Sequence, residues 1–229
     1  PVSMDAPQSV IMPSLAMVLV LDRSGSMAET QGAFSKLDLA KEASLGVLDV
    51  TQDHDLLGVI AFDSAPHWVV PLQPVENRFA FAGPIASIVP EGGTNIGPAL
   101  EEAHKALRQV DASVKHVILL SDGISAPAEW DAIAAAMRAD GITTSTVGIG
   151  RDADRELLAQ LAAWGDGRAY FTDDIHTVPQ IFATETILVS RPIRVDEPFV
   201  PQWYQQADFW TPEAPLPALG GYVITTAKA

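Results

Sequence analysis

Three runs of mainly apolar residues constrain the fold of this chain more than any other feature of its sequence. They cover residues 17–21, 56–62 and 115–120. Such runs are typical of strands buried on both faces, which occur in parallel sheets covered by helices. Helical patterns follow or separate them, at residues 37–50, 96–110, 128–139, 154–163 and 174–189. The alternation predicts an α/β fold: a doubly wound, mostly parallel sheet with helices on both faces.

The remaining predicted elements have shorter sequence patterns. Residues 67–72 form a short apolar run bounded by Pro66 and Pro71, and proline confines such a run to the edge of a sheet. We therefore expect one short antiparallel edge strand there. The sequence also predicts strands at residues 142–149 and 168–171, a short helix at 78–88 and a polar link at 31–36.

The first apolar run ends abruptly in Asp22-Arg23-Ser24-Gly25-Ser26, where short oxygen-bearing side chains occupy every second position. In an extended loop, alternate side chains point the same way, so Asp22, Ser24 and Ser26 can converge on one point. One carboxylate and two hydroxyls suit a hard cation such as Mg²⁺. The alternative is an ordinary turn, because Asp, Ser and Gly are common turn residues.

Two later segments carry similar side chains beside predicted strands or helices. Thr94 lies in the glycine-rich turn at residues 90–95, and Asp122 lies in the turn Ser121-Asp122-Gly123 that ends the apolar run at 115–120. In open parallel sheets, ligands bind beyond the carboxyl ends of the strands. We therefore expect one edge of the sheet to gather five candidate metal ligands: Asp22, Ser24, Ser26, Thr94 and Asp122.

Composition excludes several classes of function. The formal net charge of −15 argues against binding nucleic acid, whose phosphates require basic patches. The chain has no cysteine, which excludes disulfides, zinc–thiolate sites and thiol catalysis. No apolar run reaches the roughly 18 residues expected of a membrane helix, and no signal peptide is evident.

With these segments in place, the chain resembles a von Willebrand factor A (VWA) domain. Asp22-Arg23-Ser24-Gly25-Ser26, Gly93-Thr94-Asn95 and Ser121-Asp122-Gly123 look like the family's metal-ion-dependent adhesion site (MIDAS). The resemblance implies a Rossmann-like fold and one divalent ion, Mg²⁺ first, with Ca²⁺ or Mn²⁺ as alternatives. It also implies a protein partner that supplies an Asp or Glu carboxylate to the ion. No catalytic residue is expected.

The end of the chain has a different character from the rest. Residues 191–229 contain six prolines and six aromatic residues, and we expect them to pack on a surface. Phe182-Ala183-Thr184-Glu185-Thr186, Glu197-Pro198-Phe199 and Gly221-Tyr222-Val223 resemble bacterial membrane-anchored proteins in which a VWA domain precedes a glutamine-amidotransferase-like domain. That resemblance implies a longer parent protein, with this part in a periplasmic or extracellular compartment. The predicted organisation is a lead-in segment (1–13), the VWA domain (14–189) and a tail (190–229).

Two rival functions remain open at this level. The site could belong to a Mg²⁺-dependent hydrolase acting on phosphoesters, or the ion could be only a structural staple. The sequence does not favour the hydrolase, because Ser24 occupies the place of the second Asp of a haloacid-dehalogenase-like phosphatase and no phosphate-binding loop occurs.

Several residues near the motifs, and the histidines, are interpreted as follows. Arg23 is interpreted as forming a salt bridge under the loop, with a partner contact as the alternative. Glu91 and Asn95 are candidates for supporting the ligands, or ordinary turn residues. The five histidines are interpreted as surface or strand-end residues: His54, His67, His104, His116 and His176.

Overall fold

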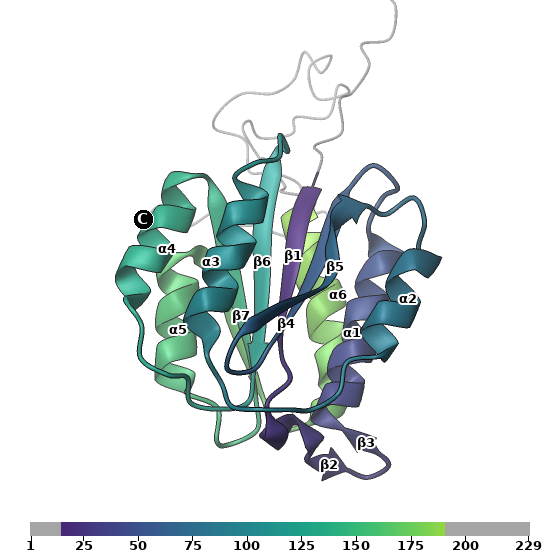
Figure 1. Ribbon diagram of the computed structural model, residues 1–229, viewed down its shortest axis with the longest axis vertical. Helices are drawn as coiled ribbons and strands as arrows, with labels where there is room; N and C mark the ends of the chain where they lie inside the picture. The colour runs from purple at the N-terminus through teal and green to yellow at the C-terminus, as the bar shows by residue number, and fades with distance from the viewer. Residues whose placement is uncertain (1–14, 191–229) are drawn as a thin grey trace, which may run out of the picture. The chain divides into compact units, whose positions relative to one another are not determined.

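The computed structural model describes residues 15–190, so the predicted lead-in segment and nearly all of the predicted tail lie outside the described residues. Its main sheet has six strands in the order β5-β4-β1-β6-β7-β8 (Figure 1). The strands are β1 (Leu15–Asp22), β4 (Leu56–Phe62), β5 (Pro66–Pro74), β6 (Val114–Ser121), β7 (Ile142–Ile149) and β8 (Asp166–Thr172). All neighbours are parallel except β4 and β5, which are antiparallel. The predicted fold class, including the antiparallel edge strand, is therefore confirmed.

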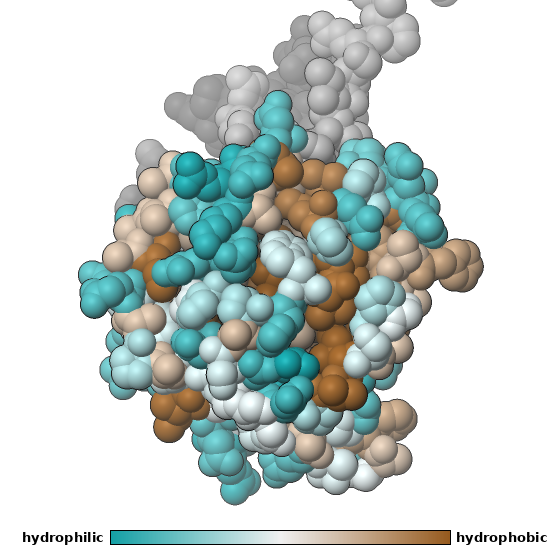
Figure 2. Space-filling model, viewed as in Figure 1, coloured by the Kyte–Doolittle hydropathy of each residue, from teal (hydrophilic) through white to brown (hydrophobic). Residues whose placement is uncertain are grey.

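Six helices cover the two faces of this sheet, and both faces bury apolar side chains. One core contains residues of α1 (Lys36–Val50), α2 (Phe79–Ala86) and α6 (Val178–Ser190). The other contains residues of α3 (Ile96–Leu107), α4 (Trp130–Ala139) and α5 (Arg155–Trp164). Figure 1 shows the first group of helices to the right and the second to the left. On this side of the molecule most of the surface is polar, with an apolar band beside β5 (Figure 2).

The central strand β1 contributes side chains to both apolar cores. All of its residues are buried. Met17, Leu19 and Leu21 belong to the core under α1, α2 and α6, whereas the alternate residues Val18 and Val20 belong to the other core. Side chains that alternate across a strand produce this division, so an unbroken apolar run is what a strand covered on both faces requires.

The direction of the connections changes at β1, and this sets the position of the site. The chain leaves β1 through α1 to reach β4 on one side, and it returns later through α3 to β6 on the other. In doubly wound sheets the crevice for ligands opens at such a point, outside the carboxyl ends of the strands. Here that point is the end of β1 at Asp22.

Residues 31–36 differ from the predicted polar link. The chain forms a small antiparallel hairpin from β2 (Thr30–Gln31) and β3 (Phe34–Ser35). Gly32 turns it with a φ of +69°, a conformation that favours glycine. Strands of two residues carry too little periodicity to be recognised from sequence, so this projection beside the β1 loop was not predicted.

The interpretation of His116 as a surface or strand-end residue is wrong. The side chain is fully buried, and burial holds its pKa below the ordinary value for histidine. Its Nδ1 lies 2.7 Å from Thr143 Oγ1, and its Nε2 lies 3.4 Å from Oε1 of Glu185. The physical reason is that β6 is an interior strand with both faces covered, so side chains of either orientation become buried.

The carboxylate of Glu185, next to His116, accepts hydrogen bonds from three further side chains. Its Oε1 accepts a hydrogen bond from Ser145 at 2.6 Å, and its Oε2 accepts from Tyr170 at 2.7 Å and from Arg168 at 3.1 Å. Burial alone would raise the pKa of this carboxyl group, but hydrogen bonding from its neighbours outweighs burial and lowers the pKa to about 2. Glu185 is therefore an ionised, fully buried group that joins α6 to β7 and β8.

Candidate metal centre at the end of the central strand

The loop after β1 is folded around the carboxylate of Asp22. Oδ1 of Asp22 accepts a hydrogen bond from the backbone N–H of Ser24 at 2.8 Å, which closes the turn. Oδ2 accepts from the hydroxyl of Ser121, at the end of the neighbouring strand β6, at 2.6 Å. The side chain is completely buried, and burial raises its pKa despite these hydrogen bonds. A cation close to this carboxylate would stabilise its ionised form.

The second carboxylate, Asp122, lies directly beside the same loop. Its Oδ1 accepts a hydrogen bond from the Ser26 hydroxyl at 2.7 Å. The hydroxyl oxygens of Ser24 and Ser26 are 3.0 Å apart. Coulombic repulsion from Asp122 contributes to the raised pKa of Asp22. Four of the five predicted ligand residues are thus brought together, with Ser24, Ser26 and Asp122 in one hydrogen-bonded chain.

Thr94 reaches this place from the loop that precedes α3. A Cβ atom built on Gly123 would lie 3.6 Å from Thr94 Oγ1, so Thr94 sits against the turn that holds Asp122. The Thr94 carbonyl accepts a hydrogen bond from the backbone N–H of Ala126 at 3.0 Å. Within residues 15–190 the hydroxyl of Thr94 has no hydrogen-bonding partner. The structure therefore places all five predicted residues at one edge of the sheet, with this hydroxyl free for a ligand.

The donor set fits a hard divalent ion. It consists of two carboxylates and three hydroxyls, and oxygen atoms are the ligands that Mg²⁺ and Ca²⁺ prefer. Among the described residues, no group of three or more His, Cys, Asp or Glu side chains could hold a metal ion. An ion at this edge would therefore depend on the hydroxyls of Ser24, Ser26 and Thr94 as well as on the two carboxylates.

Arg23 forms salt bridges beside the loop, as predicted. It pairs with Asp63 in the β4–β5 turn, and its Nη2 lies 3.6 Å from Oε2 of Glu91. The backbone of Arg23 also links both sides, because its N–H donates to Phe62 O and its carbonyl accepts from the N–H of Glu91. Arg23 therefore joins the β1 loop to the two loops beside it.

The support for the Thr94 loop comes from Asp63 as well. A Cβ atom at Gly92 would lie 2.9 Å from Cβ of Asp63, and Gly92 has a φ of +72°, so glycine is required there. The N–H of Asn95 donates to the carbonyl of Asp63 at 2.8 Å. Glu91 and Asn95 thus position the loop that carries Thr94, and neither contacts the candidate ligands through a hydrogen bond that the structure records.

Sequence reasoning missed two residues that touch the carboxylates, Ser121 and Lys36. Ser121 could have been found from strand register, because Leu21 pairs with Leu120 and the next residues, Asp22 and Ser121, are then neighbours. Lys36 could not have been found in this way, because the sequence at the start of a helix does not indicate which residue the end of a long side chain will contact. Its Nζ donates to Oδ2 of Asp122 at 2.8 Å and also pairs with Glu29.

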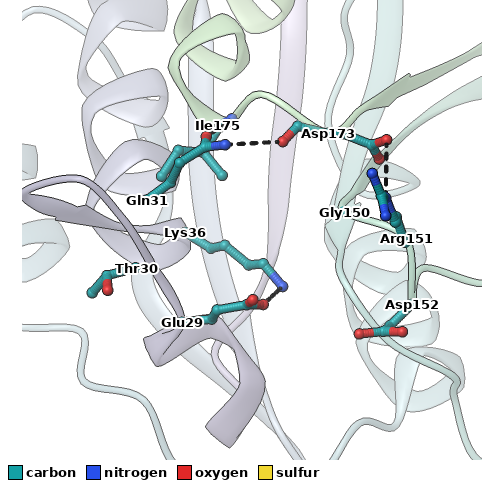
Figure 3. Close-up of a pocket in the computed structure, with 9 residues that line it drawn as sticks. All are labelled: Glu29, Thr30, Gln31, Lys36, Gly150, Arg151, Asp152, Asp173 and Ile175. Carbon is teal, nitrogen blue, oxygen red and sulfur yellow. Dashed lines mark hydrogen bonds and ion pairs between the residues drawn. The ribbon is translucent and has the colours of Figure 1, made fainter.

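Lys36 is charged and mostly buried in this position. Burial alone would lower its pKa, but the hydrogen bonds with Asp122 and Glu29 outweigh burial and raise it. The Glu29 carboxylate, which is exposed, has its pKa lowered by the same contact. A pocket of about 390 Å³ opens beside Lys36, between the β2–β3 hairpin and the loop after β7 (Figure 3). Arg151 and Asp173 line its far side.

The family follows from comparison with known proteins. The family model described as the von Willebrand factor type A domain matches residues 16–184. The chain belongs to this family. A curated relative, an uncharacterised protein of Synechocystis, is 31% identical over 73% of this chain and 41% of its own length. The VWA domain here thus spans less than half of that relative.

Solved structures share the fold of this VWA domain. A von Willebrand factor type A protein from Catenulispora acidiphila has a TM-score of 0.71 and 24% identity, over 78% of this chain and 43% of its own. An aerotolerance-related membrane protein from Bacteroides fragilis has a TM-score of 0.66 and 18% identity, over 76% and 98%. Proximal thread matrix protein 1 from the mussel byssus, with a zinc-occupied MIDAS motif, has a TM-score of 0.66 and 20% identity, over 78% and 48%.

Proposed function

We propose that this VWA domain is a divalent-metal-dependent protein-binding module. The observation that carries the proposal is the convergence of Asp22, Ser24, Ser26, Thr94 and Asp122 at the end of β1. The zinc-occupied MIDAS motif of the mussel byssus protein supports a metal ion at the corresponding place. We propose Mg²⁺ as the resident ion, because all five side chains offer hard oxygen ligands.

The partner is proposed to bind through an Asp or Glu carboxylate. The site supplies only two negative charges, from Asp22 and Asp122, and its other ligands are neutral hydroxyls. A divalent ion held there would not be over-neutralised, so it would provide a positive centre for one more carboxylate. Because the whole chain carries a formal charge of −15, it would repel acidic partners elsewhere, and capture would be confined to this site.

The setting of the domain is proposed from its relatives. The structural neighbour from Bacteroides fragilis is described as an aerotolerance-related membrane protein, which supports a membrane-anchored parent for this domain. Within residues 15–190, no helix is long and apolar enough to cross a membrane. We propose that the domain lies outside the bilayer, in a periplasmic or extracellular compartment, and that a further domain of the parent follows it.

Replacing Thr94 tests the function most cleanly, because Thr94→Ala removes a hydroxyl that no described residue uses. We expect Thr94→Ala to lose most partner capture from an extract of the parent cell in Mg²⁺. Thr94→Ser keeps the hydroxyl and is the matched control, so it should capture the same protein as the wild type. EDTA should release that protein from both the wild type and Thr94→Ser.

The alternatives give different results in the same experiment. Capture that survives both Thr94→Ala and EDTA would contradict a metal-dependent contact. If Mg²⁺ raised the melting temperature while capture stayed unchanged, the ion would be only a staple. Mg²⁺-dependent turnover of generic phosphoesters, lost in Thr94→Ala, would instead show a hydrolase.

A further inference from the structure

Lys36 places an ammonium group against the candidate metal site. Its Nζ donates a hydrogen bond to Oδ2 of Asp122 at 2.8 Å, and Ser26 donates to the other oxygen, Oδ1, at 2.7 Å. Both oxygens of this carboxylate therefore already have partners. The Lys36 side chain is only 8% exposed, so water screens its charge poorly at the point of contact.

The surroundings hold this ammonium in place. Lys36 is the first residue of α1, and its backbone N–H donates to the carbonyl of Glu29 at 3.0 Å. Ser35 caps the helix and forms a capping box with Asp38, which fixes where the helix begins. A Cβ at Gly150 would lie 3.4 Å from Nζ, so the glycine leaves room for the side chain. The Lys36 charge is thus built into the fold.

We propose that Lys36 tunes both the affinity of the site for a divalent ion and the preference of the metal-loaded site for an anionic ligand. Its fixed positive charge weakens the hold of the empty site on a divalent ion, and it strengthens the preference of the loaded site for an anionic group of the partner. The inference rests on the proposed function and assigns a role to a residue outside the five candidate ligands. Lys36 acts through Asp122 and through its charge.

Two effects of the contact act in the same direction on metal affinity. The ammonium repels any cation that approaches Asp122, because like charges at short range repel strongly where the effective dielectric is low. Its hydrogen bond also occupies one oxygen of the carboxylate that the ion requires. Glu29 offsets part of the charge, but its side chain is 65% exposed and is therefore well screened.

The charge has the opposite effect on an anionic ligand. When Asp22 and Asp122 balance a divalent ion, Lys36 adds a positive charge in direct contact with Asp122, and the exposed carboxylate of Glu29 offsets this charge only in part. Lys36 also lines the pocket of about 390 Å³ beside the site (Figure 3), where a group of the partner can approach it. A carboxylate that reaches the ion would therefore gain from both charges.

The first measurement is calorimetric titration of Mg²⁺ into the wild type and Lys36→Met, which keeps the alkyl stem but removes the charge. We expect the variant to bind Mg²⁺ at least about tenfold more tightly. Lys41→Met, on the same helix, is the matched control, since it changes net charge equally and Lys41 donates only to Ala86 O in the recorded hydrogen bonds. Its affinity should match that of the wild type within about twofold.

The second measurement uses acetate as the anionic probe. Water-proton relaxation of the Mn²⁺-saturated domain falls as acetate displaces water from the ion. We expect acetate to bind the wild type at least about threefold more tightly than Lys36→Met. Equal acetate affinity would overturn the role of Lys36 in anion preference.

The experiments distinguish a folding defect from failure of the inference, and failure of the inference from failure of the proposed function. Lys36→Met leaves Oδ2 of Asp122 without its donor; if that variant fails to fold, Lys36→Gln keeps a neutral donor and takes its place. A variant that is less stable but has wild-type Mg²⁺ affinity would show a purely structural lysine and overturn the inference alone. If neither Mg²⁺ nor Mn²⁺ bound to the wild type, to the Lys36 variant or to Lys41→Met, the proposed function would be overturned together with the inference.

Discussion

Asp22→Ala is expected to abolish Mg²⁺ binding at the site proposed at the end of β1. The carboxylate of Asp22 closes the loop through the N–H of Ser24 and contacts β6 through Ser121. The substitution removes one of the two charged candidate ligands and also the hydrogen bond that shapes the loop. We expect the loss of affinity to exceed the roughly 10–100-fold that follows from removing an outer partner of a metal ligand.

Calorimetry with Mg²⁺ checks this result, and Asp131→Ala provides the control. Asp131 is an exposed residue of α4, so its removal changes the net charge equally without touching the loop. Thermal unfolding in EDTA shows whether each variant is folded. A folded Asp22→Ala variant with wild-type Mg²⁺ affinity would contradict the assignment of the site to the end of β1.

Replacing Glu185 is expected to have the largest effect on stability. Glu185→Gln removes a buried negative charge while leaving Arg168 beside an uncharged amide. One hydroxyl, of Ser145 or Tyr170, also loses its acceptor. Breaking a buried charged network by changing one member costs several kcal/mol. Because Arg168 is 44% exposed and stays partly hydrated, we expect a loss of about 2–3 kcal/mol at pH 7.

The pH dependence of this difference follows from the lowered pKa. The pKa of Glu185 falls from 4.5 to about 2 in the folded protein. A depressed carboxyl pKa stabilises the fold above the unfolded value, and this contribution is lost as the pH falls through the folded value. The stability difference between wild type and Glu185→Gln should therefore shrink as the pH falls from about 4.5 towards 2.

Urea denaturation of both proteins at pH 7 and pH 3 measures this change. Glu42→Gln, at an exposed position of α1, is the control and should change stability by less than about 0.5 kcal/mol. A stability difference that stayed constant between the two pH values would show that Glu185 has the same pKa in the folded and unfolded states, and would contradict the lowered pKa.

The sequence predicts the fold and the gathering of site residues for the same reason. Asp22 and Asp122 each lie within two residues of the end of an apolar run that predicts a buried parallel strand, and parallel strands end at one edge. That placement requires no knowledge of side-chain conformation. Thr94 was expected on a different ground, because its loop precedes α3 and follows no strand directly; its place in a glycine-rich turn at a helix entry indicated it, and the family resemblance supported it.

What could not be predicted depends on contacts between elements. Lys36 reaches Asp122 only because α1 begins at Lys36, after the capping residue Ser35, and because Gly150 leaves space; neither feature is visible near residue 122 in the sequence. His116 was misjudged because a polar residue near the start of a strand is usually exposed. Here Glu185 of α6, distant in sequence, covers it.

The most direct test of the account is a crystal of the domain grown with Mn²⁺ and measured at the manganese absorption edge. The account predicts one strong anomalous peak at the end of β1, within coordinating distance of oxygen atoms from the loops that carry Asp22, Thr94 and Asp122. A peak elsewhere, such as beside Asp152 and Asp173 in the neighbouring pocket, would contradict the central claim. So would a well-ordered site at saturating Mn²⁺ in which the Lys36–Asp122 contact is intact and no peak is present.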